Sequence, residues 1–192
     1  MKKILAFIVI GTLFLIGCQE AGNPIAPVSE NETDLTSFNQ PNWITLPKPD
    51  NMSIERHFSS KKKINGKRGG DVHLKAEYEG GVHGVVKIDA RIQFPRKAFS
   101  GIQDITLIID SENGLTTFYP HMKFNKSAVY DLKFDGLDLS NVDPDNIDFV
   151  YQSEDGTIEK VEYDKLKVDI KAGKIEIQKA KLNHFSRYGF VN

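Results

Sequence analysis

The sequence has only one cysteine, Cys18, so no disulfide can form within the chain. The stability of any folded domain must therefore come from the burial of apolar side chains. An excess of one charge is also missing, because 25 Lys and Arg residues are matched by 26 Asp and Glu residues. A chain with so nearly equal numbers of the two charges lacks the basic character of a nucleic-acid-binding protein, and we expect no nucleic-acid partner.

Sequence motifs for enzymes and cofactors are missing as well. The chain contains no nucleophilic serine motif, no phosphate-binding loop and no paired-carboxylate arrangement. Its acidic stretch, Asp135 to Asp148, fails the calcium-loop pattern, and residues 143–146 within it (Asp-Pro-Asp-Asn) are typical of a turn. We therefore expect no enzyme, no metal and no cofactor. The histidines, which lack the spacing of a metal site, are His57, His73, His83, His121 and His184.

Long apolar runs are absent except at the N-terminus, where Ile4 to Gly17 follow Met1-Lys2-Lys3. A positively charged start and an apolar run of 14 residues are the layout of a secretory signal peptide. A helix of that length would rise about 21 Å, whereas the hydrocarbon core of a bilayer is about 30 Å thick. We therefore interpret residues 1–17 as an export signal and not as a permanent transmembrane helix.

The apolar run ends in Leu15-Ile16-Gly17-Cys18, which resembles the lipobox of bacterial lipoproteins. The resemblance implies a diacylglyceryl group on the Cys18 sulfur and cleavage after Gly17, so membrane lipid becomes a partner through acylated Cys18. Two or three acyl chains, palmitate among them, would hold the protein firmly at a membrane. The predicted location is the cell envelope, and Gln19 in place of Asp favours the outer membrane if the host has one.

Residues 18–60 contain five of the eight prolines and many Asn, Ser, Glu and Thr residues. Such a composition buries too little apolar surface to offset the entropy of ordering, so it predicts a flexible tether. Within it, Phe38, Trp43, Ile44 and Leu46 form a small apolar island. We expect this island to dock on the protein's own domain, with docking on a partner as the alternative.

Residues 61–192 have the pattern of an all-β domain. Apolar and polar residues alternate in short segments, and turn residues separate these segments. Asp155-Gly156 and Ala172-Gly173 accept the positive φ that tight hairpins require. The pattern predicts an antiparallel β-sandwich without helices, in which each sheet has one wet face and one buried face. The ten predicted strands are 72–78, 86–94, 105–109, 115–119, 128–134, 147–152, 158–163, 167–170, 175–179 and 185–191.

Three stretches carry a family resemblance: residues 92–99 (Ile-Gln-Phe-Pro-Arg-Lys-Ala-Phe), 119–128 (Tyr-Pro-His-Met-Lys-Phe-Asn-Lys-Ser-Ala) and 184–188 (His-Phe-Ser-Arg-Tyr). They resemble segments of the ZU-five β-sandwich domain, which is shared by zona occludens proteins and Unc-five netrin receptors and also occurs in bacterial surface proteins. The resemblance covers most of residues 69–190 and implies the same fold. The sequence departs from the family's pattern in two ways: Tyr119 and Met122 replace glycines, and Ser127 stands where proline is usual.

The resemblance also implies a possible chemistry at His184, Phe185 and Ser186, because some eukaryotic relatives cleave themselves between the Phe and Ser of this strand. The reaction would need the Ser186 hydroxyl to attack the Phe185 carbonyl, a histidine to move the proton, and strain to weaken the amide. Only the segment from Ser186 onward would be released here, which gives cleavage no obvious use. We expect instead that Phe185 fills the core while His184 and Ser186 face outward or bond to neighbours.

A basic cluster, Lys61-Lys62-Lys63 with Lys67-Arg68, lies where the tether meets the domain. Anionic lipid headgroups would attract it by about 1 kcal/mol per charge, but a solvated loop is the simpler interpretation. Together these features predict a lipid-anchored, non-enzymatic binding or structural module with an envelope protein or glycan as its partner. The alternatives are a self-processing module at Phe185-Ser186 and a hydrolase assembled from separated residues, which would need a deep pocket with converging polar groups.

Overall fold

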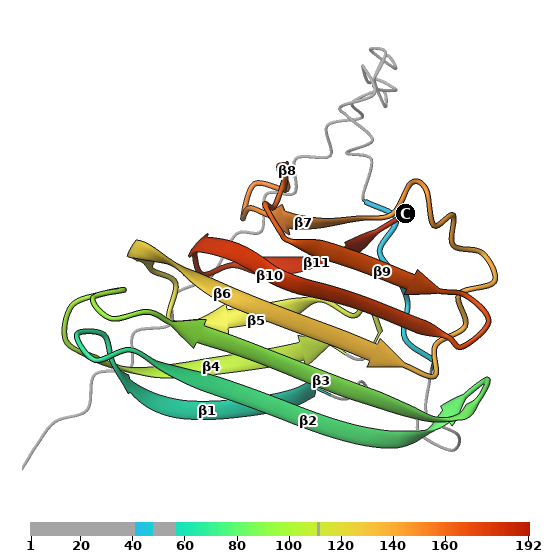
Figure 1. Cartoon of the computed structure of the whole chain (residues 1–192), viewed down its shortest axis with the longest axis horizontal. Coiled ribbons are helices and arrows are strands. Elements are labelled where there is room, and N and C mark those ends of the chain that lie inside the picture. The colour runs from blue at the N-terminus through green and yellow to red at the C-terminus, as the bar shows by residue number, and fades with distance from the viewer. Residues whose placement is uncertain (1–40, 48–56, 111) are drawn as a thin grey trace, which may run out of the picture. The chain divides into compact units, whose positions relative to one another are not determined.

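The computed structural model describes residues 41–47, 57–110 and 112–192. All regular structure in these ranges is β-strand, and two antiparallel sheets pack face to face (Figure 1). The predicted antiparallel β-sandwich is therefore confirmed. None of the described residues forms a helix with the length and apolarity needed to cross a membrane.

The six-stranded sheet has the strand order β1-β4-β5-β11-β7-β8, and the five-stranded sheet has the order β2-β3-β6-β10-β9 (Figure 1). Strands of the first sheet are β1 (His57–Asn65), β4 (Ile102–Asp110), β5 (Thr116–Tyr119), β7 (Asp148–Gln152), β8 (Ile158–Lys160) and β11 (Arg187–Val191). Strands of the second sheet are β2 (Gly70–Gly81), β3 (Gly84–Phe94), β6 (Lys123–Asp135), β9 (Lys165–Asp169) and β10 (Lys174–His184).

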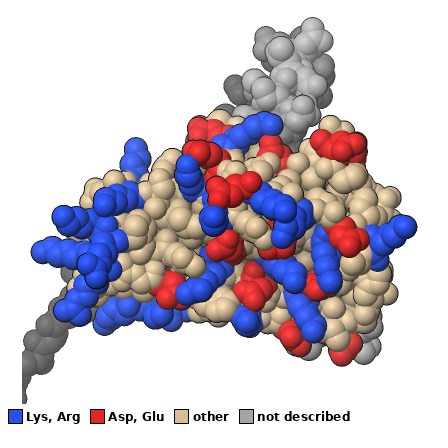
Figure 2. All heavy atoms as spheres, in the orientation of Figure 1, with Lys and Arg blue, Asp and Glu red and all other residues tan. Residues whose placement is uncertain are grey.

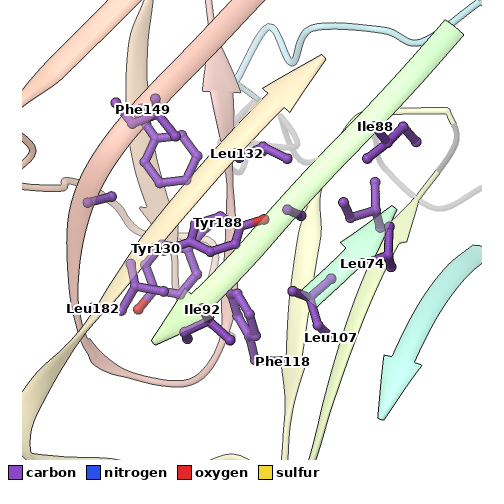
Figure 3. Packing of buried hydrophobic residues seen from close by; sticks show 14 of the residues in the cluster. Leu74, Ile88, Ile92, Leu107, Phe118, Tyr130, Leu132, Phe149, Leu182 and Tyr188 are labelled. Carbon is purple, nitrogen blue, oxygen red and sulfur yellow. The ribbon is translucent and has the colours of Figure 1, made fainter. Parts of the chain in front are cut away.

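The core lies between the two sheets, where the alternate residues of each strand meet. Figure 3 shows these side chains pointing toward one another, with Ile88, Ile92 and Leu132 from one sheet and Leu107 and Phe118 from the other. Each of these five is at most 2 % exposed. Complete burial of a side chain of this size stabilises the fold by about 1.5–3 kcal/mol, so the alternating pattern is the main source of stability.

One polar pair lies inside this core. The Thr116 hydroxyl on β5 is 2.8 Å from the Tyr130 hydroxyl on β6, so the hydrogen bond joins the two sheets. Both residues are fully buried. Burial raises the pKa of Tyr130, which keeps the phenol protonated and able to donate. The bond therefore satisfies two groups that have no access to water.

Both predicted hairpins are present. Gly156, with φ of 86°, lies in the turn between β7 and β8, and Gly173, with φ of 62°, lies in the turn between β9 and β10. A Cβ atom at Gly173 would come within 2.4 Å of the Leu137 carbonyl oxygen, so both the backbone conformation and the available space require glycine there.

The predicted boundary between tether and domain is wrong. Strand β1 begins at His57 and pairs with β4 over its whole length, so residues 57–60 belong to the sandwich. Lys61, Lys62 and Lys63 also lie within this strand and not in a solvated loop. Strand β1 is at the edge of its sheet, where charged side chains are tolerated because they reach water and discourage pairing with another chain.

The apolar island also proves to be part of the fold. Ile44 and Leu46 are 5 % and 4 % exposed, which confirms that the island docks on the protein's own domain. The Ile44 amide donates to the Phe190 carbonyl at 3.0 Å, and Trp43 forms an antiparallel bridge with Val191. Residues 41–47 thus pair with β11 and belong to the fold, not to the flexible tether predicted for them. Phe38 lies outside the described residues.

Candidate functional site

A pocket of about 700 Å³ lies where β10 ends. Three segments form it: residues 121–123 before and at the start of β6, the β7–β8 hairpin, and the turn between β10 and β11. The Phe185 amide donates to the Met122 carbonyl at 2.8 Å and ties the first segment to the third. The pocket therefore surrounds the predicted site residues His184, Phe185 and Ser186.

Phe185 lines the pocket and belongs to the core. It is 3 % exposed and stacks on Phe118, with ring centroids 5.0 Å apart and planes within 9°. The rings of Phe124 and Phe94 lie nearly perpendicular to it, with centroids 4.8 and 5.8 Å away. The expectation that Phe185 fills the core is confirmed.

Ser186 is 5 % exposed and is hydrogen-bonded on both sides. Its hydroxyl donates to the Gln152 carbonyl on β7 at 3.2 Å, and its carbonyl accepts from the Phe118 amide at 3.1 Å. Attack on the Phe185 carbonyl would require the hydroxyl to give up its bond to Gln152. The expectation that Ser186 bonds to neighbours is confirmed, and self-cleavage stays a prediction.

His184 lies half-buried on the wall of the pocket, with its ring 4.4 Å from the Tyr151 ring. The Tyr188 hydroxyl donates to the His184 carbonyl at 2.7 Å and lies 3.3 Å from the His184 Nδ1 atom. Desolvation lowers the pKa of His184, and the charge of Lys123 acts in the same direction, whereas the charge of Glu159 opposes them. The neutral imidazole is therefore favoured in the folded protein.

Three acidic side chains and one cation, Lys123, line the pocket. Glu154, Asp155 and Glu159 come from the β7–β8 hairpin and β8, and His121 lies across from them with Nδ1 3.7 Å from the Glu154 carboxylate. Hydrogen bonds from Ser153 and from the Thr157 amide lower the pKa of Asp155 to about 2, so this carboxylate is ionised at neutral pH. Such a lining complements a ligand that carries hydroxyl or amino donors.

A second pocket, of about 500 Å³, lies on the outer face of the six-stranded sheet. His57, Asp110, Tyr119 and Arg187 line it from four neighbouring strands. Tyr119 is 43 % exposed there. The sequence did not single out this group because strand register, and not spacing along the chain, brings these residues together.

The other sequence candidates are widely separated. Asp143 closes a turn, since its carboxylate accepts from the Asp145 amide at 3.0 Å and from the Asn146 side chain at 2.5 Å, which confirms the predicted turn. His73 contacts Asp89 at 2.7 Å on the outer face of the five-stranded sheet. Across the described ranges no three His, Asp or Glu side chains are arranged to hold a metal ion. Cys18 lies outside these ranges.

No family model, curated protein or solved structure matches this chain. The resemblances to the lipobox and to the ZU-five domain therefore stay predictions, and the case for function depends on the sequence and the geometry described above.

Proposed function

We propose that the chain is an exported lipoprotein, held at the cell envelope by lipid on Cys18, whose β-sandwich is a non-enzymatic binding or structural module. The observation that carries the proposal is Leu15-Ile16-Gly17-Cys18 at the end of an apolar run too short to span a bilayer.

The pocket around His184 is the proposed binding site. Aromatic rings of Tyr151 and His184 form one wall, and the carboxylates of Glu154, Asp155 and Glu159 supply acceptors at the rim. Apolar surface combined with a few placed polar groups is the usual composition of a ligand site. An envelope glycan or peptide that carries hydroxyl or amino groups fits this chemistry better than an anionic ligand.

One observation favours the second candidate, a self-processing module: His184 and Ser186 line the same pocket, on either side of the bond that would break. The hydrogen bond from Ser186 to the Gln152 carbonyl argues for the binding module, because it directs the nucleophile to another acceptor. In the described backbone, left-handed non-glycine residues occur only at Lys97 and Lys179, so no such strain falls on residues 184–186.

The anchor is tested by Cys18→Ser in a host that processes lipoproteins. This variant should lose labelling by radioactive palmitate and persist as a precursor or a soluble product, because serine lacks the sulfur that carries the lipid. Gly17→Ala is the matched control, since it keeps a small residue before the cleaved bond and should still be labelled. Palmitate labelling of Cys18→Ser would contradict the proposal.

A further inference from the structure

One end of the sandwich gathers basic side chains from three segments that are distant in sequence. These segments are the β1–β2 turn with the end of β1, the β3–β4 loop, and the start of β6. Figure 2 shows the Lys and Arg residues clustered at the left of the view, where Figure 1 places these segments. We call this surface the basic end, and its members are Lys63, Lys67, Arg68, Arg96, Lys97, Lys123 and Lys126, all exposed.

The fold holds these segments against one another. The Gly66 amide of the first segment donates to the Gly101 carbonyl of the second at 2.9 Å, and the Asn125 amide of the third donates to the Ala98 carbonyl at 2.7 Å. A Cβ atom at Gly66 would come within 2.2 Å of the Phe99 carbonyl oxygen, so the first two backbones are in direct contact. The basic end is therefore a fixed surface of the sandwich.

Few acidic side chains lie near the basic end: Lys63 is in register with Asp104, and Lys123 lines the pocket that Glu154, Asp155 and Glu159 also line. Residues 63–70, 95–101 and 120–128 contain no Asp or Glu, and within the described ranges none of the seven cations forms an ion pair. The outer face of the five-stranded sheet differs, because Lys75 pairs with Asp89 at 3.3 Å and Arg91 with Asp71 at 3.4 Å. Figure 2 shows the two signs interspersed on that face.

An exposed apolar residue accompanies these cations. Ile102 follows Gly101 at the start of β4, is 59 % exposed and pairs in register with Asn65 at the β1–β2 turn. Cations beside an exposed aliphatic side chain suit the surface of a bilayer, where the cations meet phosphates and the aliphatic group enters the boundary between headgroups and acyl chains. A soluble polyanion would use the charges but would leave Ile102 in water.

We propose that the basic end docks on a bilayer surface that carries anionic phosphate headgroups. The inference depends on the proposed function, because lipid on Cys18 would keep the sandwich close to a bilayer and raise its effective concentration there. Each cation near such a surface favours the docked state by about fivefold, so a few of them suffice to orient a sandwich that is already tethered.

The test uses the acylated protein, recovered from membranes and reconstituted into vesicles. An environment-sensitive fluorophore is attached through Ser100→Cys in the β3–β4 loop, with Val82→Cys in the β2–β3 turn, beyond the far end of β2, as the control site. In vesicles of phosphatidylcholine with about 30 % phosphatidylglycerol, emission from position 100 should shift to the blue and that from position 82 should not. About 0.5 M salt, which shortens the screening length to a few ångström, should reverse the shift.

Charge variants test the cations directly. Lys67→Gln, Arg68→Gln and Lys97→Gln together should lower the ratio of docked to undocked protein roughly a hundredfold, at about fivefold per cation. Lys75→Gln, Lys87→Gln and Lys133→Gln are the matched control, because they remove the same charge from the outer face of the five-stranded sheet and should leave the ratio unchanged.

Three results would overturn the inference: no blue shift at position 100 in anionic vesicles, an equal shift in pure phosphatidylcholine, or a shift caused by dextran sulfate added to neutral vesicles. The last would identify a site for soluble polyanions. The intact mass of the same sample shows whether the protein carries an acyl group. A missing acyl group would contradict the proposed anchor but not the proposed docking. An unacylated chain would then be sedimented with the same vesicles, and failure to bind the anionic ones would contradict docking.

Discussion

The substitution Phe185→Ala tests whether the turn between β10 and β11 is a packing element or a cleavage site. Replacing a buried phenylalanine by alanine typically costs about 3–5 kcal/mol, through lost burial and the cavity that remains. The rings around Phe185 belong to Phe94, Phe118 and Phe124, and the first two are 4 % and 0 % exposed. Neighbours so firmly packed cannot move in to fill the cavity, so we expect the upper part of that range, about 4–5 kcal/mol.

Chemical denaturation of residues 38–192, the compact unit Phe38–Asn192, measures this cost. A loss of about 4 kcal/mol corresponds to a melting temperature lower by roughly 8–16 °C for a domain of this size. Ser186→Ala is the matched control at the next residue. It removes one hydrogen bond to the Gln152 carbonyl, so it should cost only about 0.5–1.5 kcal/mol. A cost below about 1.5 kcal/mol for Phe185→Ala would refute the packing argument.

A denaturing mass spectrum of the wild-type protein addresses the cleavage hypothesis in the same experiment. We expect one chain that continues through Phe185 and Ser186 to Asn192. A peptide of residues 186–192 that disappears in Ser186→Ala would refute the non-enzymatic interpretation. Such a result would make Ser186 the nucleophile of a self-processing module.

Two further predictions concern the core. A fragment of residues 57–192 should be less stable than residues 38–192 by roughly 3–6 kcal/mol in denaturant titrations, because it keeps strand β1 but lacks the buried side chains of Ile44 and Leu46. Equal stability would show that residues 41–47 do not contribute to the fold. Tyr130→Phe and Thr116→Val should each lower the free energy of unfolding by about 1–3 kcal/mol, because each leaves the partner hydroxyl buried without a hydrogen bond. The double variant should lose less than the sum of the two single losses. Strict additivity in this double-mutant cycle would show that the two hydroxyls do not interact.

The strands that face both water and core were predictable because their side chains alternate. Strand β3 illustrates this: its even-numbered residues from Val86 to Phe94 are buried, and the predicted segment 86–94 lies within Gly84–Phe94. The hairpins at Gly156 and Gly173 were predictable for an equally local reason, since their turns require positive φ. Strands and turns with such local patterns can be predicted without knowing which strand they pair with.

Strand β1 and residues 41–47 were missed because their structure depends on distant partners. In β1, Ile64 is buried, while consecutive lysines interrupt the alternation that would have marked a strand. Its pairing comes from β4, some 40 residues later in the chain. Residues 41–47 contain two prolines and look like tether, but backbone hydrogen bonds to distant residues hold them, from the Ile44 amide to Phe190 on β11 and from the Leu46 amide to Glu112. Contacts between residues so far apart leave no trace in local composition.

The basic cluster shows how the same limit applies to function. The sequence groups Lys61 and Lys62 with Lys67 and Arg68, but the fold separates them, because Lys61 lies 3.8 Å from Asp104 and Lys62 lies 3.7 Å from Asp71. Lys67 and Arg68 remain unpaired within the described part of the chain and gain the cations of the β3–β4 loop and of early β6 as neighbours. Charge that is already paired at a surface adds little attraction for a membrane, whereas unpaired charge on a fixed surface retains it. Membrane affinity should therefore follow the neighbours that the fold assigns to each lysine and not the density of lysine along the sequence.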